Sequence, residues 1–121
     1  MIESSCHCGI LKIQIDAEVP ATLTSCSCSI CSRYGSLMAY FSSENVKISA
    51  VPSSVQKYCW GDEQIAFVRC SKCGCLSHWE SLDPKGADRM GVNARLFTNV
   101  DIEKIQVRRF DGADTWKFLD K

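Results

Sequence analysis

The chain has 121 residues, 45% of them hydrophobic, and its 14 lysines and arginines are balanced by 14 aspartates and glutamates. This length suits a single domain over residues 1–121 that folds without cross-links. The missing basic surplus argues against a nucleic-acid partner, and the lack of a long apolar run argues against a membrane partner.

Short strands are predicted along the chain, beginning at residues 10–16, where Leu11, Ile13 and Ile15 alternate with polar residues. Further strands are expected near residues 36–41, 46–49, 55–60, 64–70, 76–82, 90–97 and 105–111, with Gly61 in a hairpin turn and one helical turn at 100–104. No segment carries a helical apolar pattern of 11–18 residues. The prediction is therefore an all-β domain, a sandwich or folded sheet. Its expected interior is Leu11, Ile13, Ile15, Phe41, Ile48, Phe67, Leu76, Val92, Leu96 and Val107.

The nine cysteines fall into three clusters and one isolated residue, Cys59. The odd number disfavours a disulfide framework, and the first residues do not form a signal peptide. We therefore expect a cytoplasmic chain whose thiols bind metal. The clusters are C-x-C at Cys6 and Cys8, C-x-C-x-x-C at Cys26, Cys28 and Cys31, and C-x-x-C-x-C at Cys70, Cys73 and Cys75.

The first and third clusters together predict a closed metal site. Structural zinc is bound by four protein ligands in a tetrahedron, and "CSKCG" has the spacing of a zinc knuckle, with Gly74 at the sharp turn. The simplest set of ligands is Cys6, Cys8, Cys70 and Cys73. Removing this metal should loosen the whole fold, because binding and folding are coupled at such sites.

The middle cluster, Cys26, Cys28 and Cys31, then has only three ligands, which is the arrangement of a catalytic zinc with an open position. Three thiolates make a zinc ion a poor Lewis acid for water but a suitable dock for a small-molecule thiol. Two alternatives concern the other cysteines. Cys75 either closes this site as a fourth ligand or, as we favour, is a small buried residue. Cys59 is expected in the core.

Other side chains have both a functional and a structural interpretation. His78 is a candidate for proton transfer or substrate orientation, although a hydrogen-bonded structural role is favoured. His7 is expected to point away from the ligands on either side of it. Arg33 is a candidate partner for a substrate carboxylate, against a plain surface charge. The tryptophans Trp60, Trp79 and Trp116 are expected to be core or packing residues.

The order "CHCG", "CSCSIC" and "CSKCG" resembles the glutathione-dependent formaldehyde-activating enzyme family over nearly the whole chain. The resemblance implies a β-tent fold with two zinc ions per chain. The structural zinc would be held by Cys6, Cys8, Cys70 and Cys73, and the catalytic zinc by Cys26, Cys28 and Cys31. It also implies the joining of formaldehyde to glutathione, a carbon–sulfur lyase reaction in reverse. Cys75, where better-known members have a small hydroxyl residue, and the shorter chain leave the substrate open.

Three functions follow from these features. The first is a zinc-dependent carbon–sulfur lyase acting on an adduct of a small thiol, such as glutathione, and an aldehyde. The second is a zinc-stabilised protein-interaction module, and the third is metal storage or redox sensing by Cys26, Cys28 and Cys31. The oligomeric state is left open, a homo-oligomer included.

Overall fold

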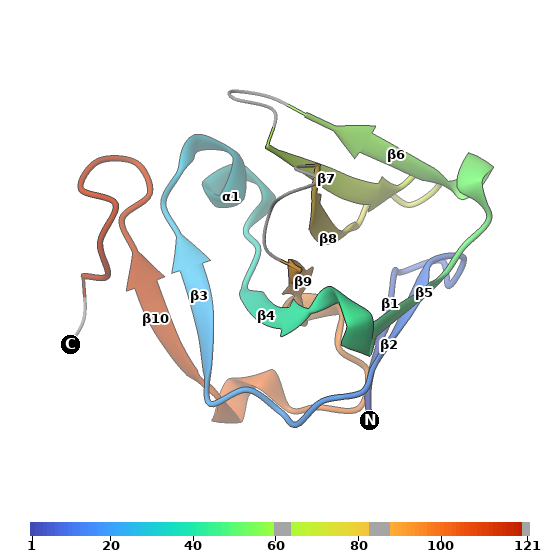
Figure 1. Cartoon of the computed structure of the whole chain (residues 1–121), viewed down its shortest axis with the longest axis horizontal. Coiled ribbons are helices and arrows are strands. Elements are labelled where there is room, and N and C mark those ends of the chain that lie inside the picture. The colour runs from blue at the N-terminus through green and yellow to red at the C-terminus, as the bar shows by residue number, and fades with distance from the viewer. Residues whose placement is uncertain (60–63, 83–87, 120–121) are drawn as a thin grey trace.

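A computed structural model describes residues 1–59, 64–82 and 88–119, and strands dominate it (Figure 1). The strands are β1 (Ile2–Ser5), β2 (Lys12–Ile15), β3 (Thr22–Cys26), β4 (Met38–Ser42), β5 (Val46–Ser49), β6 (Val55–Tyr58), β7 (Ile65–Cys70), β8 (Leu76–Ser81), β9 (Arg89–Asn93) and β10 (Gln106–Phe110). The described helices are α1 (Ser29–Tyr34) and the short 3-10 turns η1 (Ser43–Asn45), η2 (Pro52–Ser54), η3 (Ala94–Leu96) and η4 (Ile102–Lys104). The expected mainly β fold is therefore confirmed.

The strands form two sheets. One has three strands in the order β1-β2-β5, and the other has seven in the order β10-β3-β4-β9-β8-β7-β6. Pairing is antiparallel except between β3 and β10, which run parallel. Strands β3 and β4 share only the pair Thr24 and Met38, and α1 lies in the connection between them (Figure 1). Strands β3 and β4 of the seven-stranded sheet therefore separate beside this helix.

The main core includes side chains from both sheets. Ile13 and Ile15 of β2 are at most 1% exposed, and Val68 and Val92 of the large sheet are at most 2% exposed. Seven of the predicted interior residues are buried, namely Leu11, Ile13, Ile15, Phe41, Phe67, Leu76 and Val92. The alternation of apolar and polar residues in the sequence thus identified the inward faces correctly.

Three interior predictions are wrong. Ile48 is 37% exposed and Val107 is 38% exposed, because β5 and β10 are the edge strands of their sheets. Leu96 is half-buried in the turn η3 rather than in a strand. Edge strands have a neighbour on one side only, so an alternating pattern there does not guarantee burial.

The predicted strands are present with shifted ends, and the helical turn expected at 100–104 is η4. Two strands, β1 and β3, and the helix α1 were not predicted. Helix α1 has six residues and is thus too short for a visible helical pattern. The predictions for Trp60 and Gly61 lie outside the described residues. No helix in the described parts of the chain is long and apolar enough to cross a membrane.

Candidate functional site

Four cysteines from distant parts of the chain meet beside the main core. The Sγ atoms of this first cysteine cluster, Cys6, Cys8, Cys70 and Cys73, all lie within 4.8 Å of one another. The Sγ atom of Cys8 is 3.6 Å from that of Cys6 and 3.5 Å from that of Cys70. Sulfurs bound to one tetrahedral zinc lie just under about 4 Å apart, because each Zn–S bond is about 2.3 Å long. The spacing therefore suits a closed four-thiolate metal site.

Two similar turns present these thiols. The N–H groups of Cys6 and Cys70 donate to the carbonyl five residues later, at 3.0 and 3.1 Å. The N–H groups of Gly9 and Gly74 donate back to the carbonyls of Cys6 and Cys70, at 3.1 and 3.0 Å. Both glycines have positive φ, 85° and 78°, a conformation that side chains disfavour. The turn at Gly74 is the one expected from the zinc-knuckle spacing of "CSKCG".

The thiols of the first cluster differ in their affinity for protons. Backbone N–H groups, first that of Cys75 and then that of Cys8, lower the pKa of Cys73 to about 5. The pKa of Cys8 rises to about 11: the N–H of Ile10 opposes the rise, and desolvation and the neighbouring thiols cause it. A divalent cation would relieve this competition by stabilising all four thiolates.

The second cysteine cluster, Cys26, Cys28 and Cys31, lies where β3 passes into α1. Its three Sγ atoms lie within 4.8 Å of one another, and each residue is half-buried. Cys26 ends β3, Cys28 caps the helix, and the N–H of Cys31 donates to the sulfur of Cys28 at 3.4 Å. Among the described residues, no fourth cysteine, histidine or carboxylate joins these three.

The pKa values of the thiols in the second cluster favour a negative charge on Cys28. Burial, followed by the neighbouring thiols, raises the pKa of Cys31 well above its usual range. Burial also acts to raise the pKa of Cys28, but hydrogen bonds, first from the backbone of Cys31 and then from the Cys31 and Cys26 side chains, lower it overall. Cys28 is therefore the first thiolate of the three.

The segment after β10 covers the second cluster. A Cβ atom at Gly112 would lie 2.5 Å from Cys26 Sγ and 3.1 Å from Cys28 Cβ, so the Gly112 backbone sits directly against these thiols. Ser27 ties this segment to β3: its hydroxyl donates to Asp111 at 3.2 Å and accepts from the N–H of Ala113 at 3.3 Å. Only glycine leaves room for the cluster here.

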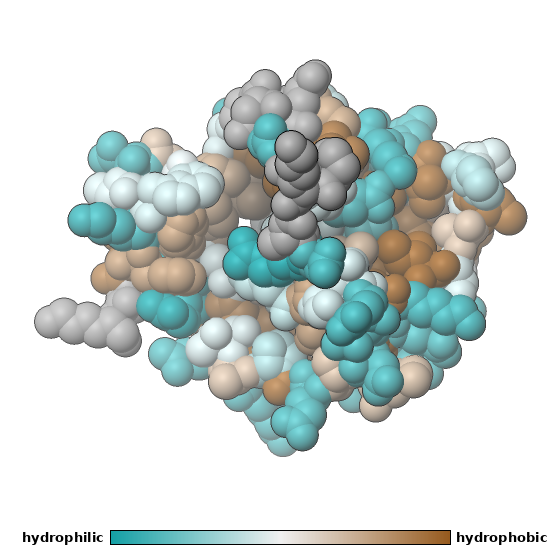
Figure 2. Space-filling model, viewed as in Figure 1, coloured by the Kyte–Doolittle hydropathy of each residue, from teal (hydrophilic) through white to brown (hydrophobic). Residues whose placement is uncertain are grey.

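A cavity of about 890 Å³ adjoins the second cluster, and Cys28 and Cys31 form part of its wall. In the space-filling view, the surface is hollowed between the β3–β10 edge and the centre of the molecule, with hydrophobic side chains in the hollow (Figure 2). Ligand sites are usually clefts of roughly 300–1,000 Å³. The cavity is thus large enough for a small organic molecule in reach of the cysteines.

Residues paired side by side across four strands of the seven-stranded sheet form the floor of the cavity. Strand register places Phe67 beside Trp79, Trp79 beside Gly91, and Gly91 beside Tyr40. The Trp79 indole lies over Gly91, where a Cβ atom would overlap its Nε1 and Cε2 atoms and lie 2.7 Å from Cδ1. The Tyr40 and Trp79 rings are 6.2 Å apart. Gly91 therefore lets two aromatic rings meet across a strand.

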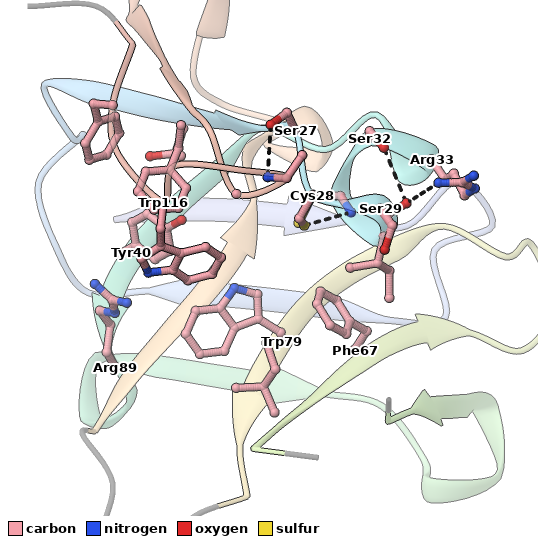
Figure 3. Close-up of a pocket in the computed structure, with 18 residues that line it drawn as sticks. Ser27, Cys28, Ser29, Ser32, Arg33, Tyr40, Phe67, Trp79, Arg89 and Trp116 are labelled. Atoms are coloured by element: carbon pink, nitrogen blue, oxygen red, sulfur yellow. Dashed lines mark hydrogen bonds between the residues drawn. The ribbon is translucent and has the colours of Figure 1, made fainter. Parts of the chain in front are cut away.

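Arg89 lies at one end of this floor. Its Cζ atom is 4.7 Å from the centre of the Tyr40 ring and 5.9 Å from that of Trp79 (Figure 3). Burial raises the pKa of Tyr40, although a hydrogen bond with Thr24 and the charge of Arg89 oppose the rise. The Tyr40 hydroxyl is therefore protonated at neutral pH.

The other side chains singled out in the sequence differ in their relation to the cavity. His78 is 1% exposed, its Nδ1 is 3.0 Å from the Ser77 hydroxyl, and it is absent from the cavity wall. Adjacent residues of a strand face opposite sides, so Trp79 in the cavity turns His78 away from it. Arg33 does line the cavity, but its Nη1 donates to the Ser29 carbonyl at 2.8 Å. His7 is exposed, as expected.

Cys59, Cys75 and Trp116 differ in their burial. Cys59 is exposed, so its expected place in the core is wrong. Cys75 is half-buried against the main core and interacts with Cys73 of the first cluster, which argues against its closing the second. Trp116 is 69% exposed and therefore lies outside the core, but its ring packs against that of Phe110 at the cavity, with 5.0 Å between the ring centres.

A model of the glutathione-dependent formaldehyde-activating enzyme family matches residues 1–109. The chain belongs to this family. The match includes both cysteine clusters, whereas the covering segment with Gly112 and Trp116 follows its end. The family resemblance seen in the cysteine motifs is thereby confirmed.

A crystal structure of a Rhodobacter sphaeroides protein has a similar fold, with a TM-score of 0.73 and 21% sequence identity. The similarity covers 87% of this chain and 98% of that one. At this identity the likeness speaks for the fold alone. The overall fold is therefore shared with an experimentally solved protein.

The donor sets of both clusters suit zinc. Thiolates are preferred ligands of zinc, and sulfurs held within 4.8 Å of one another are close to the geometry that it requires. Either cluster could hold a metal ion. The difference between them is the number of protein ligands, four against three.

Proposed function

We propose that the protein catalyses the reversible formation of a carbon–sulfur bond between a small thiol and an aldehyde, with one structural and one catalytic zinc. The observation that supports this most directly is the second cysteine cluster, which has three thiols and adjoins a cavity. A closed structural site alone would need no such space. The family description names glutathione and formaldehyde, which are therefore the first substrates to try.

In the proposed reaction, the thiol sulfur bonds to the carbonyl carbon, the thiol loses its proton, and the carbonyl oxygen gains one. Cys26, Cys28 and Cys31 would hold the catalytic zinc, which would supply an open position and keep a substrate sulfur deprotonated at neutral pH. The chain itself binds the substrate body against Trp79 and Tyr40. The Gly112 backbone shields Cys26 and Cys28 from water.

We propose that Tyr40, rather than His78, donates the proton that the carbonyl oxygen gains. Tyr40 lines the cavity together with Cys28 and Cys31, and its hydroxyl retains its proton at neutral pH. His78 faces the main core and acts instead as a structural, hydrogen-bonded residue. Tyr40→Phe should therefore slow turnover by about 10²-fold or more, whereas His78 variants should act on stability.

The experiment compares three serine variants by metal content, folding and turnover. Cys28→Ser should lose one zinc and the catalysis but keep its fold. Cys70→Ser should lose the other zinc and unfold. Cys59→Ser, the control, changes an exposed cysteine outside both clusters. Exchange between ¹³C-formaldehyde and its glutathione adduct, followed by NMR, measures turnover above the spontaneous reaction.

The possible results separate the three functions. A folded Cys28→Ser variant that exchanges as fast as the wild type would refute a catalytic role for the cluster. Two zinc ions that both resist mild chelation, with no exchange for any thiol, would favour the interaction module. Reversible oxidation of Cys26, Cys28 and Cys31 with loss of zinc would favour redox sensing.

A further inference from the structure

The described lining of the cavity is cationic and aromatic. It includes two arginines, Arg33 and Arg89, and no aspartate, glutamate or lysine among the residues that the structure describes. Its aromatic side chains are Tyr40, Phe67, Trp79, Phe110, Trp116 and Phe118. Such a wall favours a ligand with an apolar or aromatic body and a negative charge.

Arg89 is the better placed of the two cations. Arg33 donates to the Ser29 carbonyl of its own helix, at 2.8 Å. The Arg89 guanidinium instead stacks near Tyr40 and Trp79, and no carboxylate in the described ranges lies within ion-pair distance of it. A stacked guanidinium keeps the N–H groups of its planar edge for a carboxylate, which it can bind in a bidentate manner.

Register fixes the position of this arginine relative to the rings. Arg89 and Gly91 are two residues apart on β9, so they share the cavity face of the sheet. The missing side chain at Gly91 lets Trp79 lie flat across the strand, close to Tyr40. Figure 3 shows Tyr40, Trp79 and Trp116 grouped near Arg89, with Cys28 farther along the cavity. Arg89 thus lies beside the aromatic rings, while the thiols line another part of the same cavity, and Tyr40, which interacts with Thr24 of β3, lies between the two.

We propose that the substrate is a thiol with an aromatic or bulky apolar body and a carboxylate, which pairs with Arg89 while Trp79 and Tyr40 stack on the body. The identity of the thiol end rests on the proposed function, and the carboxylate end does not. Glutathione also carries a free ammonium group, for which the described lining offers no carboxylate. It should therefore bind less tightly than a monoanionic aromatic thiol.

Calorimetric titration of the purified protein, with its zinc content measured, tests the proposal. The probes are 4-(mercaptomethyl)benzoate, its methyl ester, glutathione, and 4-methylbenzoate, which has no thiol. The acid should bind about tenfold more tightly than the ester, and Arg89→Gln should abolish this preference. Lys47→Gln, which removes a positive charge from β5 of the other sheet, should leave the preference unchanged.

A second variant guards against a folding defect. Arg89→Lys keeps the charge but loses the planar, bidentate edge, so it should retain only part of the preference. Equal affinity for acid and ester, or tighter binding of glutathione than of the acid, would overturn the proposal. Arg89-dependent binding of 4-methylbenzoate, with no gain from a thiol, would support the carboxylate site and contradict the proposed thiol chemistry.

Discussion

Gly91→Ala tests the aromatic floor of the cavity. In a strand, alanine is normally favoured over glycine by about 0.5–1 kcal/mol, because glycine loses more backbone entropy on folding. Here the added Cβ atom would overlap the Trp79 indole, which is rigid and cannot give way by bending. Overpacking of this kind costs about 1–3 kcal/mol. We therefore expect a net loss of about 1–2 kcal/mol in the free energy of unfolding.

A double-mutant cycle tests whether contact with Trp79 causes the loss of stability in Gly91→Ala. In a Trp79→Ala background there is no indole for the new methyl group to meet, so Gly91→Ala should become neutral or stabilising there. Denaturant unfolding of the four proteins should give a coupling energy of about 1–3 kcal/mol. Stabilisation by Gly91→Ala in the wild-type background, or the same effect in both backgrounds, would refute the placement of Trp79 over Gly91.

Three further predictions concern other regions. If both clusters hold zinc, as proposed, Gly112→Ala should release the zinc of the second cluster and keep that of the first, because the added Cβ atom would press on Cys26 Sγ. Two retained zinc ions per chain by elemental analysis would contradict this. Glu80→Gln should lower the free energy of unfolding by about 1 kcal/mol at pH 7. The side chain of His78, 3.8 Å away, and then the hydrogen bond and charge of Lys57 lower the pKa of Glu80 to about 2, while solvent at the exposed Lys57 weakens that ion pair. A group with a depressed pKa stabilises the fold above its unfolded pKa of about 4.5, so the difference between the two proteins should shrink as the pH falls from 4.5 towards 2; a difference independent of pH would argue against it. Cys59→Ser should change the unfolding free energy by less than about 0.5 kcal/mol, and should remove one fast-reacting thiol in a titration with a disulfide reagent.

The sequence predicted the grouping of the cysteines better than the cavity. Ligand spacing and the glycines of the turns are local properties, so both clusters could be assigned from short motifs such as "CHCG" and "CSCSIC". Tyr40, Trp79 and Arg89 meet through strand order and register, which no local pattern determines. His78 shows the same limit: its neighbour Trp79 faces the cavity, and only the sheet decides which of two adjacent residues does so. The glycine at position 91, in a strand of otherwise larger residues, was the available signal.

The pairing of the first cluster also bears on the order of events during folding. Cys8 and Cys70 are 62 residues apart, and closing so long a loop in a disordered chain costs about 4 kcal/mol of entropy. Cys6 and Cys8 alone supply only half of a tetrahedral site, so an early encounter with zinc cannot hold the metal firmly. Capture should become strong only once β7 has been synthesised and has brought Cys70 into place. In this chain the metal would bind after the sheet has assembled and would stabilise it. In a zinc finger, by contrast, the metal organises a few neighbouring residues from the start.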